Sequence, residues 1–144
     1  MKAGPAQYPT MHGFEGHWKG LTPRYSHAPV ATGVPEETLR QIADALARVP
    51  EGFHAQPKIT SLHQSWRDDL HARRPIGWPF AELLCFGSLL VQGTPVRLSG
   101  QDSRRGTFSQ RHSALYDARS GERFIPLNAL SPRQAQFEVY DSLL

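Results

Sequence analysis

The chain has 144 residues, 39% of them hydrophobic, so it is long enough for one packed core and too short for two large domains. Its formal net charge of +3 comes from dispersed arginines, which argues only weakly for a polyanionic partner. The single cysteine excludes an internal disulfide and a cysteine-based metal site, a usage that fits a reducing compartment. No apolar run approaches the roughly 20 residues that span a bilayer, so neither membrane insertion nor secretion is expected.

Prolines and glycines recur throughout residues 1–33, where they remove backbone donors and disfavour the interiors of helices and strands. The sequence therefore predicts an extended connector over residues 1–33. The segment also carries the aromatic residues Tyr8, Phe14, Trp18 and Tyr25, which are too many for a free linker. We expect it to lie along the surface of a larger body.

Residues 34–75 are predicted to form a helical linker region. Pro35 fits the first position of a helix, Glu36 and Glu37 complement its N-terminus, and apolar residues follow at helical spacing up to Pro50. A second helical pattern runs over residues 59–70 and ends before the breaker at residues 73–75.

A third helix is predicted from Trp78 to the glycine at position 93, with apolar residues around most of its circumference. Such a helix should be buried, and Cys85 within it is expected to be a small structural hydrophobe rather than a nucleophile.

Short strands are predicted at residues 95–98, 123–127 and 137–140 from their branched and aromatic residues. Residues 141–144 are predicted to be the cap and first turn of a further helix. A buried helix followed by strands indicates an α/β fold in which residues 76–144 supply only part of the sheet, so this domain is predicted to be incomplete.

The densest polar stretch is SGQDSRRGTFSQRH at residues 99–112, placed just after the strand predicted at residues 95–98. Ligands of open α/β sheets bind at the carboxyl ends of the strands, so this loop is the candidate site. Gly100 and Gly106 allow a close approach of the backbone or a positive φ. The loop also offers an amide, a carboxylate, three guanidinium groups and an imidazole, on Gln101, Asp102, Arg104, Arg105, Arg111 and His112.

Each of these side chains has a purely structural interpretation as well. Asp102 would cap the following turn, and the loop arginines would pair with surface acids such as Asp117 or Glu122. His112 would be a proton carrier or, as is more common for a lone histidine, a hydrogen-bonded structural residue. His12 and His17 have the only close histidine spacing, and no metal site is assigned. The loop lacks the glycine-lysine-serine/threonine ending of a phosphate-binding P-loop.

The segment GTPVRLSGQDSRRGTFSQRHSALYD, residues 93–117, closely resembles the first part of the pyrimidine-binding domain in a known enzyme family. That family is the thiamin-diphosphate-dependent decarboxylase component of the 2-oxoglutarate dehydrogenase complex. PEGFHAQPKI and IGWPFAELLCFGSLL, at residues 50–59 and 76–90, are similar to the family's preceding helical region. ERFIPLNAL and FEVYDSLL, at residues 122–130 and 137–144, continue the likeness, which covers roughly residues 33–144.

The resemblance implies a transketolase-like pyrimidine-binding domain beginning in residues 76–144. It implies an oxidoreductase of the tricarboxylic acid cycle that decarboxylates 2-oxoglutarate and transfers the succinyl unit to a lipoyl group, with thiamin diphosphate and magnesium as cofactors. In such enzymes a catalytic glutamate follows the sequence DSLL. The chain ends there, at Leu144, so we expect it to be inactive and to bind the cofactor weakly by itself.

The resemblance also implies partners: the rest of a longer polypeptide, a second copy in a homodimer, and the lipoyl-bearing succinyltransferase component. It implies the bacterial cytoplasm or the mitochondrial matrix as location. Gln101, Asp102, Arg105 and His112 are expected to line or support the mouth of the active site. His112 is the catalytic candidate among them.

The alternative is a small non-catalytic module that binds phosphate or nucleic acid through Arg104, Arg105 and Arg111. It lacks a nucleic-acid motif, and Asp102 and Asp117 dilute the positive charge. The sequence therefore favours the enzyme, with no nucleic-acid partner.

Overall fold

The computed structural model describes residues 16, 19, 20 and 24–143, which belong to two compact units, Met1–Thr32 and Gly33–Leu144. In the first unit, the backbone N–H of Lys19 donates to the carbonyl of Gly16, and residues 24–32 form neither helix nor strand. Tyr25 is 79% exposed. The expectation for Tyr8, Phe14 and Trp18 concerns residues outside those that the structure describes.

The second unit contains the three predicted helices, α1 (Glu36–Leu46), α2 (Pro57–His71) and α3 (Trp78–Val91). Pro35 precedes α1 as its N-cap instead of occupying the first helical position. Pro57 and Pro79 stand in the first turns of α2 and α3, where a missing backbone N–H costs nothing. The division of this unit at residue 75 stays a prediction.

The core forms where one face of α1 meets α3 and the C-terminal segment. Gly87 allows the two helices to approach closely, since a Cβ atom there would lie 2.6 Å from Cγ2 of Ile42. The rings of Trp66 and Phe80 stack at 5.4 Å and join α2 to the same core. The buried cluster consists of Ile42, Ala43, Leu46, Phe80, Leu83, Leu84, Leu90, Leu127, Phe137 and Val139.

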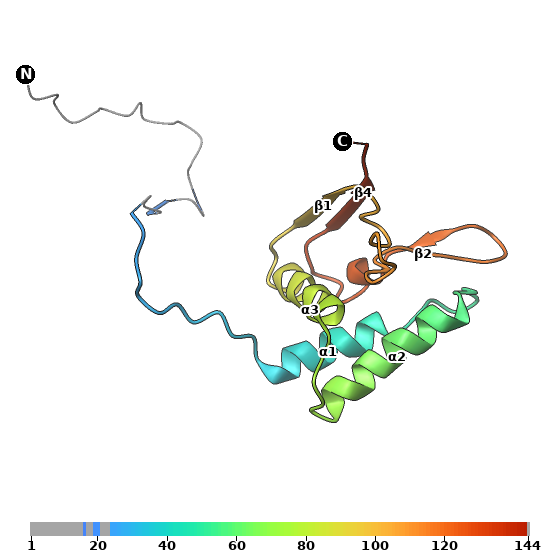
Figure 1. Cartoon of the computed structure of the whole chain (residues 1–144), viewed down its shortest axis with the longest axis horizontal. Coiled ribbons are helices and arrows are strands. Elements are labelled where there is room, and N and C mark those ends of the chain that lie inside the picture. The colour runs from blue at the N-terminus through green and yellow to red at the C-terminus, as the bar shows by residue number, and fades with distance from the viewer. Residues whose placement is uncertain (1–15, 17–18, 21–23, 144) are drawn as a thin grey trace, which may run out of the picture. The chain divides into compact units, whose positions relative to one another are not determined.

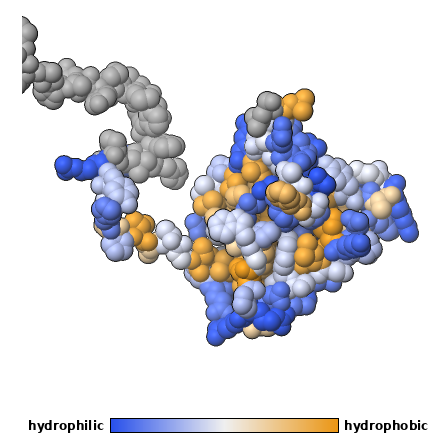
Figure 2. Space-filling model, viewed as in Figure 1, coloured by the Kyte–Doolittle hydropathy of each residue, from blue (hydrophilic) through white to orange (hydrophobic). Residues whose placement is uncertain are grey.

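The prediction that α3 is buried on most sides is wrong for one face. Trp78 is 83% exposed, Leu89 is 36% exposed, and Cys85 is an exposed free thiol rather than a core residue. Figure 2 shows apolar side chains at the surface among hydrophilic ones. None of the helices in the described part of the chain has the length and apolar character needed to cross a membrane.

Two small sheets complete the unit, which is therefore mixed α/β (Figure 1). Strand β1 (Val96–Gly100) pairs in parallel with β4 (Phe137–Asp141), so that Val96 lies opposite Phe137 and Gly100 opposite Asp141. The hairpin of β2 (Leu115–Tyr116) and β3 (Arg123–Phe124) is antiparallel. The strands predicted at residues 95–98 and 137–140 are thereby confirmed, whereas β2 was not predicted.

Two of the predicted elements are wrong in part. The strand expected over residues 123–127 ends at Phe124, because Pro126 lacks a ladder donor and begins the short 3-10 helix η2 (Pro126–Asn128). The helix expected to start at Asp141 is absent from the described residues. Asp141 instead ends β4, and Ser142 continues the pairing by donating its N–H to the carbonyl of Gly100 at 3.0 Å.

Candidate functional site

The polar loop leaves the sheet at the edge where both parallel strands end. Gly100, the last residue of β1, has φ 151°, and Asp141 ends β4 beside it. One carboxylate oxygen of Asp141 accepts the backbone N–H of Arg104 at 2.9 Å. The start of the loop is therefore fixed to the carboxyl end of the neighbouring strand, the position at which open α/β sheets bind ligands.

A cavity of about 410 Å³ opens beside this loop. Asp102, Arg105 and His112, three of the four predicted site residues, line it together. Gln101 does not, and instead lines an adjoining hollow of about 300 Å³ together with Asp102 and Asp141. The other residues around the larger cavity are Gln56, Ile59, Arg104, Ala114, Leu115, Tyr116 and Asp141.

The loop backbone is strained where it carries these side chains. Asp102, Ser109 and His112 have φ values of 52°, 54° and 47°, in the left-handed region that disfavours side chains. Residues held in this way cost of order 1–3 kcal/mol each and cluster at ligand sites. The carbonyl of Asp102 accepts the N–H of Arg105, whereas its carboxylate makes no capping hydrogen bond within the described residues.

The loop arginines do pair with acids, but not with the predicted Asp117 or Glu122. Arg105 lies 3.8 Å from Asp102, and Arg104 lies 3.7 Å from Asp141 while donating from Nη1 to the Tyr116 hydroxyl at 3.3 Å. The guanidinium of Arg111 pairs with Glu82 of α3. All three positive charges thus have acidic neighbours, which disfavours the free basic patch that a polyanion would need.

His112 is half-buried at the end of the loop, and its backbone N–H donates to the carbonyl of Arg105 at 3.1 Å. Burial lowers the pKa of its imidazole, a hydrogen bond to the backbone of Ser109 opposes this change, and the nearby charge of Arg105 adds to it. The neutral imidazole, able to accept a proton, is therefore the favoured form at neutral pH.

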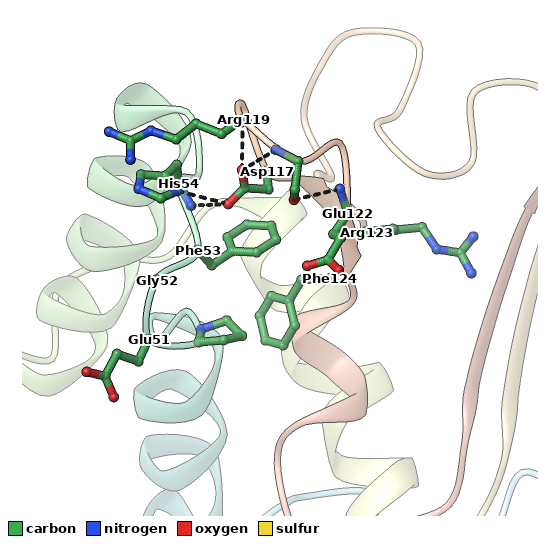
Figure 3. A pocket seen from close by; sticks show the side chains of 11 residues that line it. Glu51, Gly52, Phe53, His54, Asp117, Arg119, Glu122, Arg123 and Phe124 are labelled. Carbon is green, nitrogen blue, oxygen red and sulfur yellow. Dashed lines mark hydrogen bonds and ion pairs between the residues drawn. The ribbon is translucent and has the colours of Figure 1, made fainter.

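A second cavity, of about 510 Å³, lies between the segment before α2 and the β2–β3 hairpin (Figure 3). Phe53 and Phe124 face it, with ring centroids 5.7 Å apart. At its rim the side chains of His54 and Asp117 point toward one another, and Nδ1 of His54 donates to Asp117 at 3.2 Å.

Asp117 is buried, and its carboxylate is an acceptor for the backbone. It receives the N–H groups of His54 at 2.5 Å, Arg119 at 2.7 Å and Ser120 at 2.9 Å. These hydrogen bonds, the one from His54 foremost, hold the pKa of the Asp117 carboxyl far below its usual range. Since these three N–H groups belong to the backbone of both segments, Asp117 clamps the segment before α2 onto the hairpin.

Sequence reasoning missed the residues that other elements contribute to these cavities. Gln56 and Ile59 come from the start of α2 and Tyr116 from a strand that was not predicted, so no local pattern marks them. Asp117 did carry a signal, because Asp followed by Ser120 and Gly121 is typical of a turn in which the carboxylate accepts backbone N–H groups.

The described residues hold no group of three or more histidine, cysteine, aspartate or glutamate side chains that could bind a metal ion. The chemistry around the loop is instead that of hydrogen bonding by a carboxylate, guanidinium groups and an imidazole. These groups can orient a polar ligand and exchange a proton with it.

No protein-family profile matches this chain. In sequence it is similar to the 2-oxoglutarate dehydrogenase E1 component of Rickettsia conorii, with 44% identity over 92% of the chain. The E1 component of Rickettsia felis is 42% identical over 94% of the chain, and that of Bacillus mycoides is 44% identical over 81%. The chain spans only 14% of the length of the two Rickettsia relatives and 12% of the Bacillus one. It is therefore related by descent to a stretch of the 2-oxoglutarate dehydrogenase E1 component.

Proposed function

We propose, from the relationship of this chain to the 2-oxoglutarate dehydrogenase E1 component, that it forms part of an enzyme that decarboxylates 2-oxoglutarate. The observation that carries this proposal is the identity of 42–44% over more than nine tenths of the chain. Residues 76–144 would contribute the beginning of a transketolase-like, pyrimidine-binding domain, with residues 34–75 as the helical region that precedes it. A parallel strand pair with a polar loop at its carboxyl end supports this assignment.

The polar loop would face the thiamin diphosphate or the substrate. The loop cavity has the size of a small-molecule site, for which about 300–1,000 Å³ is usual. Asp102, Arg105 and His112 would supply hydrogen bonds there, with Gln101 at the margin. Thiamin diphosphate, when bound, supplies the electron sink for decarboxylation. The proposal assigns no magnesium ligand to the described residues.

The proposed partners follow from the same relationship. They are the remainder of a longer polypeptide, a second copy in a homodimer, and the lipoyl-bearing succinyltransferase component that takes the succinyl unit. The proposed location is the bacterial cytoplasm or the mitochondrial matrix. The alternative, a module that binds phosphate or nucleic acid, is not supported, since its three arginines all have acidic neighbours.

A chimera tests the proposed function. The matching 133 residues of the Rickettsia conorii E1 component would be replaced by those of this chain, and release of carbon dioxide from 2-oxoglutarate would be measured with thiamin diphosphate and magnesium present. We expect turnover close to that of the unaltered relative. The 144-residue chain alone should release no more than a protein-free control. A folded chimera without turnover would refute the proposal.

Within the chimera, His112→Ala tests the catalytic candidate. If His112 contacts substrate or cofactor, kcat/KM should fall roughly 10- to 1,000-fold, about 1.4 to 4 kcal/mol, as for loss of one positioned polar group. His71→Ala, at the exposed end of α2, is the control and should retain near-normal turnover. A lower Tm with unchanged kcat/KM in His112→Ala would assign the residue a structural role.

A further inference from the structure

Arg111 connects the polar loop to α3 through an ion pair with two hydrogen bonds. Its Nε donates to Oε1 of Glu82 at 2.5 Å, and its Nη2 donates to Oε2 at 3.2 Å. The remaining nitrogen, Nη1, donates to the carbonyl of Ser103 at 3.3 Å. One guanidinium therefore joins the beginning of the loop, the end of the loop and the helix.

This pair is better shielded from water than the other ion pairs of the loop. The side chains of Arg111 and Glu82 are 15% and 24% exposed, whereas those of Arg105 and Asp102 are 55% and 47% exposed. The Arg105–Asp102 distance of 3.8 Å also exceeds hydrogen-bond length. Exposed pairs of that kind contribute little, so Arg111–Glu82 is the ion pair that matters for the loop.

Glu82 is the only charged residue of α3, whose sequence is WPFAELLCFGSLLV. Burying a lone carboxylate on an apolar helix costs free energy unless a cation pairs with it in good geometry. Arg111 supplies this cation, and the ion pair holds the loop against α3. Glu82 is thereby explained as an anchoring point for the loop.

The strained loop needs such an anchor. The N–H of Ser113 donates to the carbonyl of Arg104, and those of Arg111 and His112 donate to that of Arg105. These bonds close the loop upon itself without attaching it to α3. Left-handed residues such as Asp102 and His112 persist only where the surroundings over-determine the backbone.

We propose that Arg111, acting through Glu82, is the positioning residue that fixes the loop and so makes Asp102, Arg105 and His112 face one cavity. The importance of that cavity rests on the proposed function. The fixing itself is a property of this chain, and it can be measured without substrate or cofactor.

The test is hydrogen exchange on the 144-residue chain, comparing loop amides with core amides of β1. In Arg111→Met, exchange of the amides of residues 111–113 should accelerate about tenfold or more, equivalent to about 1.4 kcal/mol of local opening. The amide of Leu98 in β1 should keep its rate. Arg111→Lys retains the charge and loses the two-pronged hydrogen bonding, so it should show a smaller acceleration in the same amides.

A second readout is the imidazole of His112, followed by NMR titration in Arg111→Lys. Because burial lowers its pKa in the native loop, a loosened loop should move that pKa up toward the ordinary value of about 6.5. The charge at position 111 is unchanged in this variant. A rise would therefore report the exposure of His112 and not a lost cation.

Two controls complete the design. Arg74→Met removes a comparable guanidinium from an ion pair with Asp69 at the end of α2 and should leave loop exchange unchanged. The reversed pair, Glu82→Arg with Arg111→Glu, should restore much of the protection lost in Arg111→Met.

Loop exchange within twofold of the native rate in Arg111→Met would overturn the proposal. So would equal acceleration in loop and core, since Arg111 would then support the whole unit. Neither result depends on catalysis, so a failed chimera and a failed exchange experiment remain distinguishable.

Discussion

Asp117 shows how a single carboxylate can replace regular structure. Its carboxylate oxygens accept hydrogen bonds from the backbone N–H of His54, before α2, and from those of Arg119 and Ser120, within the hairpin turn. Two segments far apart in sequence are joined in this way without a shared strand or helix. The negative charge strengthens these bonds, because an ionised carboxylate accepts hydrogen bonds more strongly than a neutral group does.

Asp117→Asn should therefore lower Tm by several degrees at pH 7. The pKa of Asp117 is lower in the folded state than its unfolded value of about 3.9, so the unfolded state binds more protons in acid. The stabilisation is fully present well above about pH 4 and is lost gradually as the pH falls from there toward the lowered pKa of the folded state. The difference in the free energy of unfolding between the native chain and Asp117→Asn, measured with urea, should be smaller at pH 3 than at pH 7. A difference as large at pH 3 as at pH 7 would contradict this account.

His63 is the second residue whose protonation couples to folding. It is 5% exposed, its Nδ1 donates to the carbonyl of Leu46 at 3.2 Å, and its Nε2 has no hydrogen-bond partner among the described residues. Burial lowers the pKa of His63, and the nearby charge of His112 lowers it further. The hydrogen bond to the backbone of Leu46 acts in the opposite direction and raises this pKa. The folded chain thus favours the neutral ring.

The native chain should lose stability as the pH falls below the ordinary histidine pKa of about 6.5, since the unfolded state then binds the additional proton. In His63→Leu this loss between pH 7 and pH 5 should be smaller, although the variant starts from a lower stability. Chemical unfolding at the two pH values measures both effects. Equal pH dependence in the two chains would exclude His63 as the cause.

At the scale of elements, α1 and α3 are close because position 87 lacks a side chain. Alanine at a helix interior normally gains about 1 kcal/mol over glycine. Here its Cβ would meet Cγ2 of Ile42 at 2.6 Å and Cδ1 of Leu130 at 3.3 Å, and Ile42 is only 2% exposed. Overpacking of a buried site costs about 1–3 kcal/mol, so steric conflict should outweigh helix propensity.

Gly87→Ala is thus expected to destabilise the chain by up to about 2 kcal/mol, the difference between these two effects. Ile42→Ala removes the conflicting methyl group, so the double variant should cost less than the sum of the two single ones. Urea unfolding of the native chain, the two single variants and the double variant gives the four free energies of unfolding for this double-mutant cycle. Strict additivity would show that the two side chains do not meet.

The elements that the sequence predicted well are those with a local signal. The three helices have apolar periodicity and prolines at their starts, and β1 and β4 are rich in branched and aromatic residues. Strand β2 has two residues, which is too short for any pattern to register. The loop was found as a candidate site from its composition, whereas its attachment to Glu82 joins residues 29 positions apart and leaves no local trace.

At the scale of the whole unit, the parallel sheet is small. Strands β1 and β4 pair only with one another among the described residues, and two parallel strands alone are uncommon because such sheets are normally wide and covered on both faces. On the side of Arg97 and Tyr140 the sheet is exposed, with the guanidinium 5.2 Å from the ring centroid. Exposed Trp78 and Leu89 add apolar surface on α3.

The isolated chain is therefore expected to associate at high concentration and to bind a dye that reports exposed apolar surface. Light scattering across a concentration series, together with dye fluorescence, measures both properties. Within the proposed larger enzyme the same surfaces would be covered. A monomer that unfolds sharply and cooperatively, without binding the dye, would contradict this expectation.

The parallel register of β1 and β4 also bears on the order of folding. Val96 must find Phe137 across the whole loop, the hairpin and η2, so the entropy of closing this long connection opposes early pairing. The contacts of α1 with α2 and α3 join residues that are closer in sequence. All of these residues have been synthesised before β4. The helices should therefore pack first on the ribosome, and the loop would gain its final shape only when β4 arrives and Asp141 takes the N–H of Arg104.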